Sequence, residues 1–228
     1  MIWTPSPNFA ERMLPVSMLV LHYTGMKNGA EAIAWLANPA SKVSAHYVVD
    51  EDGQVVHMVR EEMRAQHAGL SHWRGITDCN SASIGIEIVN PGHEWGYRPF
   101  PEAQMQALIP LVAEIVGTYS IQPRNVVGHS DVAPARKMDP GELFEWERLA
   151  KLGLAVPRPA AKVDPGWSDA SFLLALERFG YGIADGLKAV IAFQRRFRPE
   201  IVDGVVDGEC RAILWALLLE YEGGPAIG

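Results

Sequence analysis

The chain has 228 residues, of which 48% are hydrophobic and 21% are charged, and its net charge is −7 at pH 7. This composition is typical of a globular protein with one large domain, or one medium and one small domain, and it excludes a disordered or fibrous chain. The acidic balance disfavours a nonspecific nucleic-acid binder, because such a protein needs a basic surface to neutralise phosphates.

The two cysteines, Cys79 and Cys210, fall in parts of the chain that we assign to different domains. We therefore expect free thiols rather than a disulfide framework. Residues 1–7 lack the basic segment of a signal peptide, and the apolar run that follows is too short to span a membrane. This favours a cytoplasmic protein without a membrane span; a periplasmic protein whose leader has been removed is the alternative. The sequence does not indicate an oligomeric state.

Up to residue 152, short apolar runs alternate with helical patterns, which predicts an α/β domain. The predicted strands are residues 16–22, 45–49, 54–59, 84–89 and 126–127. The second and third of these strands flank Asp52-Gly53, a typical hairpin turn. The predicted helices are residues 29–38, 101–119 and 142–152. Between residues 101 and 119 the apolar side chains recur three and four positions apart, so this helix has an apolar stripe to pack on the sheet.

The chain changes character after residue 152. Residues 153–166 contain three prolines and read as a semi-rigid linker. Helical patterns follow at residues 168–179, 186–197 and 207–220, with a turn at 202–208. We therefore predict a mixed central sheet flanked by helices in residues 1–152, the linker, and a small three-helix domain in residues 167–228.

The most informative segment is residues 128–141, which place His129, Lys137 and Asp139 on one short irregular loop. A zinc site that performs hydrolysis needs three protein ligands and one open position for water. His129 and Asp139 are two candidate ligands, and His22, at the end of a predicted buried strand, is the best third. Taken singly, each of these residues also has an ordinary structural explanation.

Four segments carry a resemblance to a known family: residues 20–24, 43–50, 79–87 and 128–141. In this order they resemble the zinc-dependent N-acetylmuramoyl-L-alanine amidases of the type 2 amidase family, which are related to phage T7 lysozyme and the peptidoglycan recognition proteins. The resemblance covers about residues 18–146 and implies a Zn²⁺ ion bound by His22, His129 and Asp139. The C-terminal part resembles a peptidoglycan-binding domain, and a structural helical cap is the alternative.

The resemblance also implies two catalytic residues. Lys137 matches a family lysine whose charge stabilises the oxyanion of the tetrahedral intermediate. Glu87 is the candidate that moves the proton from water to the leaving amine. The alternatives are a solvated lysine and a strand carboxylate that faces solvent.

One position departs from T7 lysozyme and the recognition proteins, which have a tyrosine where this chain has Ala45. The departure places the chain near the bacterial branch that uses a glutamate on the later strand, as in the anhydromuropeptide amidases and the outer-membrane murein amidase. We expect His46 to be a packed histidine that faces away from the cleft and is no ligand. The candidate substrate-binding residues are Tyr47, Arg64, His67 and Trp73, although packing within a loop would also explain the last three.

The sequence therefore predicts a zinc enzyme that cuts the bond between N-acetylmuramic acid and L-alanine in peptidoglycan or its anhydromuropeptide fragments. A catalytically silent muropeptide-binding protein of the same fold is the alternative. A D-alanyl carboxypeptidase is disfavoured, because its ligands follow the order His, Asp, His. A wall-binding tail favours polymeric substrate and the missing leader favours recycled fragments, so the two clues conflict.

Overall fold

A computed structural model describes residues 1–160 and 163–222. Its centre is a six-stranded sheet with the strand order β1-β5-β4-β7-β3-β8. The strands are β1 (Ile2–Trp3), β3 (Met18–Tyr23), β4 (Tyr47–Val49), β5 (Val55–His57), β7 (Ser83–Ile88) and β8 (Val126–Gly128). β3 runs parallel to β7 and β8, whereas β4 and β5 form the predicted antiparallel hairpin. The sheet is therefore mixed, as the sequence predicted. A small second sheet pairs β2 (Phe9–Glu11) with β6 (Met63–Ala65).

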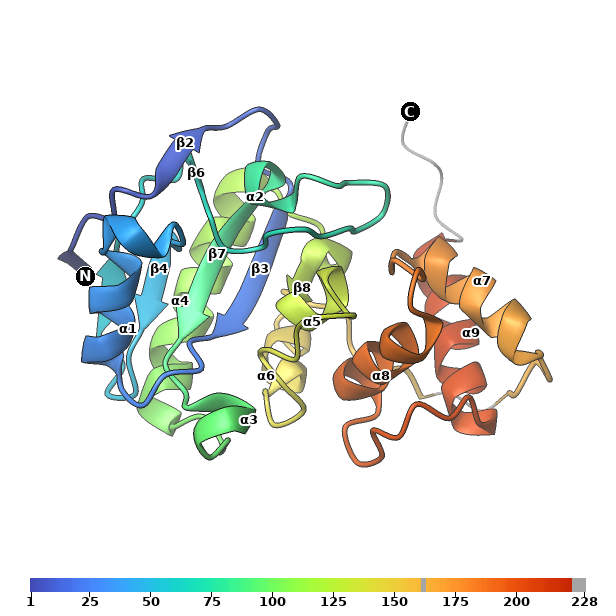
Figure 1. The fold of residues 1–228 in the computed structure, drawn as a ribbon. Helices are drawn as coiled ribbons and strands as arrows, with labels where there is room; N and C mark the ends of the chain where they lie inside the picture. Colours follow the sequence, from blue (N-terminus) through green and yellow to red (C-terminus); the bar gives the residue numbers. More distant parts are fainter. Residues whose placement is uncertain (161–162, 223–228) are drawn as a thin grey trace.

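One face of the sheet is covered by α4 (Glu102–Tyr119), as Figure 1 shows. Alternate residues of β3 and β7, such as Leu21 and Ile86, pack against the apolar stripe of this helix, which includes Met105 and Leu108. The intervening residues, including His22 and Glu87, therefore point to the opposite face.

Shorter helices lie on both faces of the sheet and at its ends, and the last of them contributes Trp146 and Leu149 to the apolar cluster on the α4 face. The helix α1 (Gly29–Leu36) is capped at its N-terminus by Asn28, whose side chain accepts a hydrogen bond from the Glu31 backbone N–H. The others are α2 (Cys79–Ala82), α3 (Gly92–Trp95), α5 (His129–Val132) and α6 (Trp146–Ala150), with 3₁₀ turns at Pro39–Ser41 and Pro123–Asn125. Within the described residues, no helix is both long and apolar enough to cross a bilayer.

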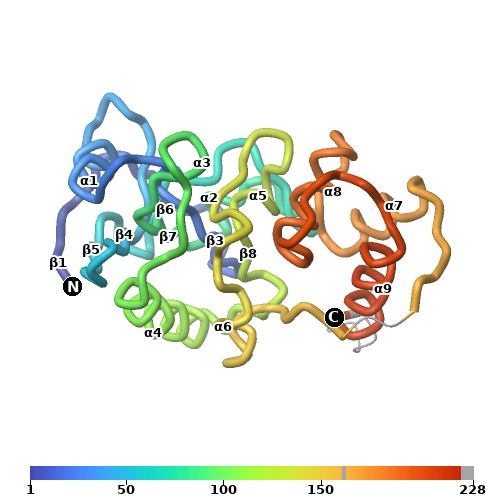
Figure 2. Tube along the Cα trace, turned by 90° about the horizontal axis from the view of Figure 1, so that it is seen from below, coloured from blue at the N-terminus to red at the C-terminus, as the bar shows by residue number. Residues whose placement is uncertain are grey.

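The C-terminal helical part consists of α7 (Asp169–Phe179), α8 (Gly186–Phe197) and α9 (Gly208–Glu222). It lies beside the N-terminal α/β part, with α8 next to α5 (Figure 2). The two parts share one hydrophobic core, in which Val20 and Val132 of the first part join Phe193 and Leu217 of the second.

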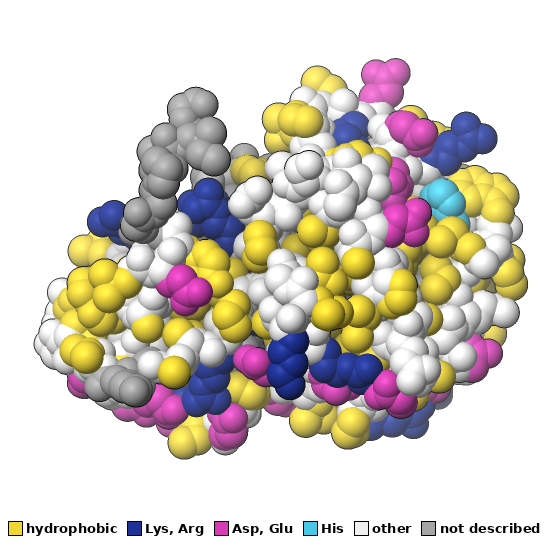
Figure 3. Space-filling model, turned by 180° about the vertical axis from the view of Figure 1, so that it is seen from behind, with side chains coloured by type: hydrophobic (Ala, Val, Ile, Leu, Met, Phe, Trp, Pro, Cys, Tyr) yellow, Lys and Arg dark blue, Asp and Glu magenta, His cyan; other side chains and the backbone are white. Residues whose placement is uncertain are grey.

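The predicted linker is packed in its first half. Leu154, Ala155 and Val156 are buried, and Arg158 forms ion pairs with Glu200 and Glu209. On the face shown in Figure 3, basic and acidic side chains lie next to each other along the lower edge. The domain boundaries themselves remain a prediction.

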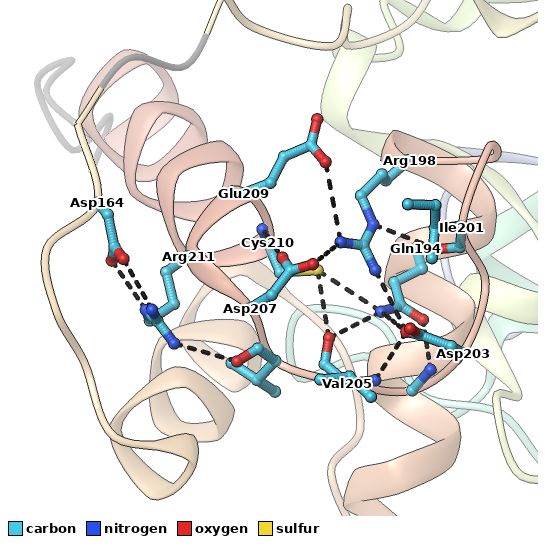
Figure 4. A network of polar contacts seen from close by, with 12 residues as sticks. Asp164, Gln194, Arg198, Ile201, Asp203, Val205, Asp207, Glu209, Cys210 and Arg211 are labelled. Carbon is cyan, nitrogen blue, oxygen red and sulfur yellow. Dashed lines mark hydrogen bonds and ion pairs between the residues drawn. The ribbon is translucent and has the colours of Figure 1, made fainter.

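A polar network holds the turn before α9 (Figure 4). The buried guanidinium of Arg198 donates to the carboxylates of Asp203 and Asp207 and to the Ile201 carbonyl. The amide of Gln194 donates to Asp203 and to the Val205 carbonyl. The turn predicted at residues 202–208 is thus held by side chains from the end of α8.

Candidate metal centre

Three ligand-type atoms from distant parts of the chain converge at the carboxyl end of the sheet. Nδ1 of His22 lies 2.9 Å from Nδ1 of His129, and each lies 3.0 Å from Oδ2 of Asp139. The ligand atoms of a tetrahedral zinc ion stand about 3.3 Å apart, because each lies about 2.0 Å from the ion. All three side chains are buried, with exposed fractions of 1%, 3% and 6%. The three atoms are therefore able to bind one common ion.

Sheet register explains the convergence of the two histidines. Leu21 of β3 lies opposite Gly128 of β8, and the two strands are parallel, so His22 and His129 follow at the same edge. Asp139 is tied to His129 through the backbone, because the Ser130 N–H donates to the Asp139 carbonyl at 2.8 Å. A Cβ at Gly128 would come within 2.7 Å of Pro140, so this close approach of the loop ends requires glycine.

The hydrogen-bond partners of the two Nε2 atoms, which point away from the three ligand atoms, determine which ring nitrogen of each histidine carries the proton. Nε2 of His129 lies 3.0 Å from the Ala68 carbonyl and must donate to it. Nε2 of His22 lies 3.0 Å from Nδ1 of His67, and Nε2 of His67 lies 3.4 Å from Oγ of Ser83. The Ser83 hydroxyl already donates to the Cys79 carbonyl. His67 therefore donates to Ser83 and accepts from His22.

Both ligand Nδ1 atoms consequently present lone pairs. Two lone pairs and a carboxylate oxygen within about 3 Å, with no proton between them, repel one another unless a cation lies among them. Burial and the charge of His129 lower the pKa of His22 to about 4. Burial raises the pKa of Asp139, but the charge and hydrogen bonds of the two imidazoles, whenever these are protonated, outweigh it and hold this pKa well below its usual range. At neutral pH His22 and Asp139 thus have the protonation states that bind a metal.

Glu87 faces the same site from the neighbouring strand. It lies opposite His22 in the β3–β7 register, and its Oε2 is buried without a hydrogen-bond partner. Burial raises the pKa of Glu87 well above its usual value, and the charge of Asp139 raises it further, whereas the charge of Lys137 lowers it. A carboxyl group with a raised pKa is suited to accept and return a proton near neutral pH.

Two basic residues precede Asp139 and have different surroundings. The guanidinium of Arg136 donates to the carbonyls of Ala68 and Leu70, so it holds the loop around residues 68–70 against the metal loop. Lys137 is half-buried and lines the cleft, and its positive charge acts on both Glu87 and His22.

The site opens into a cleft of about 350 Å³. Its polar end contains Glu87, Lys137 and Asp139. Further along, the cleft is lined by the side chains of Trp35 and Val43, which are 47% and 38% exposed. Trp35 lies on α1, and the sequence prediction missed it; the signal was a large aromatic on the exposed face of an amphipathic helix.

Tyr47 does not line the cleft, so this prediction was wrong. Its ring packs in the core on the α4 side of the sheet, and its hydroxyl donates to Glu61 at 2.8 Å. His46, the residue before it, lies on the cleft side of the sheet instead of facing away. It is fully buried, and its Nδ1 accepts from the Gly85 N–H, so it is packed as expected and is not among the metal ligands.

Trp73 and Arg64 also lie outside the cleft, contrary to the prediction. Trp73 is 2% exposed and packs edge-on against Tyr181 of the C-terminal helical part. Arg64 forms an ion pair with Asp78 at 3.2 Å. Neither side chain lines the cleft, because each has a structural partner elsewhere.

His67 does line the cleft, but both of its ring nitrogens are engaged. Its ring sits directly over Gly85, where a Cβ would lie 2.5 Å from the ring. The structure therefore places His67 as the side chain that orients His22.

Three ligand atoms, a carboxyl group with an unpaired oxygen and a lysine in one cleft are typical of hydrolases that use a metal ion. Residues 12–142 match the N-acetylmuramoyl-L-alanine amidase family, and the chain belongs to this family and is an amidase. The chain is 37% identical to N-acetylmuramoyl-L-alanine amidase AmiD of Escherichia coli, in a match covering 90% of this chain and 83% of that protein.

Solved structures agree with this assignment. The complex of E. coli AmiD with anhydro-N-acetylmuramic acid-L-Ala-D-γ-Glu-L-Lys superimposes with a TM-score of 0.83 over 93% of this chain and 92% of that one, at 37% identity. AmpDh3 of Pseudomonas aeruginosa in complex with an anhydromuramic pentapeptide gives a TM-score of 0.83 at 34% identity, over 90% and 92% of the two chains.

The orienting role of His67 predicts that His67→Ala weakens Zn²⁺ binding by about 10- to 100-fold, the usual effect of losing the partner of a ligating histidine. The affinity is measured by competition with a chelator of known affinity. His57→Ala is the matched control, because Nε2 of His57 lies 2.9 Å from the Val59 carbonyl, away from the site. Equal zinc affinity of His67→Ala and the unmodified protein would show that His67 does not orient His22.

Proposed function

We propose that the protein uses Zn²⁺ to hydrolyse the amide bond between N-acetylmuramic acid and L-alanine in peptidoglycan or its anhydromuropeptide fragments. One observation carries this proposal: two imidazole lone pairs and a carboxylate converge beside Glu87 and Lys137 in a single cleft. The relatives whose structures contain anhydromuropeptides support the substrate class.

In this mechanism His22, His129 and Asp139 hold the zinc ion. When bound, zinc polarises a water molecule and lowers its pKa towards about 7. The raised pKa of Glu87 and its unpaired Oε2 suit it to take a proton from the attacking water and to pass it to the leaving amine of L-alanine. The ammonium group of Lys137 supplies fixed positive charge for the oxyanion of the tetrahedral intermediate.

The remainder of the cleft binds the substrate. Trp35 and Val43 offer an apolar surface of the kind on which the hydrocarbon face of a sugar ring packs. Glu87 and Lys137, which a binding protein does not need, favour an enzyme over a silent muropeptide-binding protein of the same fold.

The activity itself is tested by analysing products. With a soluble anhydromuropeptide as substrate, the protein loaded with Zn²⁺ should release the free anhydromuramic sugar and an intact stem peptide. A chelator should abolish this reaction, and added Zn²⁺ should restore it. Mass spectrometry identifies the products, and intact sacculi assayed in parallel distinguish fragments from polymer. A peptide cut internally, or activity that persists in chelator, would contradict the proposal.

Glu87→Gln should slow turnover by about 100-fold or more while zinc remains bound, because the amide cannot accept the proton. Steady-state kinetics and metal analysis together provide the test. Glu61→Gln is the control, since Glu61 accepts from Tyr47 on the other side of the sheet and should leave kcat unchanged. Loss of zinc from Glu87→Gln would instead assign Glu87 a role in holding the metal.

Trp35→Ala should raise KM several-fold and change kcat little, because it removes binding surface that the ground state and the transition state use alike. Trp95→Ala is the control: this tryptophan is 52% exposed but does not line the cleft. A fall in kcat at constant KM would be inconsistent with a binding surface at Trp35.

A further inference from the structure

The metal loop, residues 128–142, is held at two points by the C-terminal helical part. At one point the Tyr181 hydroxyl donates to Oδ1 of Asp131 at 2.7 Å. At the other, Nε of Arg195 donates to Oε2 of Glu142 at 3.2 Å. The first contact lies between His129 and Asp139 in the chain, and the second lies three residues after Asp139.

The first contact is deeply buried. Asp131 is 2% exposed and Tyr181 is fully buried, so water does not replace the hydrogen bond between them. The guanidinium of Arg196 lies 3.6 Å from Oδ2 of Asp131, stacks on the Trp146 ring and donates to the Val126 carbonyl of β8. Two side chains of the helical part thus position the Asp131 carboxylate and the strand that leads to His129.

Asp131 transmits this contact to the ligands. Its Oδ2 accepts a hydrogen bond of 2.7 Å from the Gly128 N–H, the residue immediately before His129. The Ser130 N–H in turn donates to the carbonyl of Asp139. A shift of Asp131 would therefore move the backbone on both sides of His129 and, through Ser130, the backbone of Asp139.

We propose that the C-terminal helical part positions the metal ligands, with Tyr181 and Arg196 as positioning residues that act through Asp131. The proposal rests on the proposed function in requiring that the site binds zinc. It gives the helical part a role in the metal centre that is separate from any contact with peptidoglycan.

The test uses Tyr181→Phe in the full chain, which removes one hydroxyl and keeps the buried ring. Zinc affinity, measured by chelator competition, should fall at least about threefold, a smaller effect than for the direct partner of a ligand. Tyr47→Phe is the matched control, because it removes a tyrosine hydroxyl that donates to a carboxylate at 2.8 Å on the other face of the sheet. It should lower stability without changing zinc affinity.

A double-mutant cycle with Asp131→Ala, which removes every side-chain acceptor at this position, shows whether the hydroxyl acts through Asp131. We expect the effect of Tyr181→Phe on zinc affinity to disappear when Asp131 is already Ala. Unchanged zinc affinity in Tyr181→Phe, or losses that add independently, would overturn the proposal. Failure of the unmodified protein to bind zinc would instead refute the proposed function.

Discussion

The parallel pairing of β3 with β7 on one side and β8 on the other is the constraint on which the site depends. Parallel strands end at the same edge of a sheet, so side chains that follow them meet there. His22 and His129 are 107 residues apart in the chain, yet their Nδ1 atoms lie 2.9 Å apart. The same register puts Glu87 next to His22, and the alternation of β7 turns it away from the apolar α4 face.

This arrangement has an electrostatic cost. Three electron-rich atoms are brought together in a place from which water is largely excluded, where repulsion is poorly screened. The surrounding groups fix the three ligand atoms in this unfavourable geometry. The Ala68 carbonyl and His67 accept hydrogen bonds from the Nε2–H groups of His129 and His22, and Asp131 anchors the metal loop. A bound cation relieves the repulsion, so the fold prepares its metal site at the expense of its own stability.

Much of the architecture followed from the sequence. Apolar runs located the strands, and a helical stripe located α4, because burial on one face leaves a periodic trace in the sequence. Alternation also predicted that residues 46 and 47 point to opposite faces. It did not say which face carries the cleft, so Tyr47 was assigned to the wrong one.

Two of the candidate substrate residues, Trp73 and His67, are engaged by partners that lie far away in the sequence. Trp73 packs against Tyr181, more than a hundred residues later, and the nitrogens of His67 are engaged by His22 and Ser83. A loop motif shows which residue types are present, but not which of them the rest of the fold uses for packing. Residues 154–156, at the start of the predicted semi-rigid linker, are buried, and this packing was not predicted because the partners that bury them are not visible in the local sequence.

The shared core also limits how such a protein can change over generations. Val20, Val127, Val132 and Trp73 pack in one hydrophobic cluster with side chains of the C-terminal helical part. Loss of the three helices in a related protein would expose these hydrophobic side chains to solvent. Polar substitutions would then be needed at these positions to keep the protein soluble. Gain or loss of the three helices is therefore coupled to substitutions at several separate positions of the α/β part.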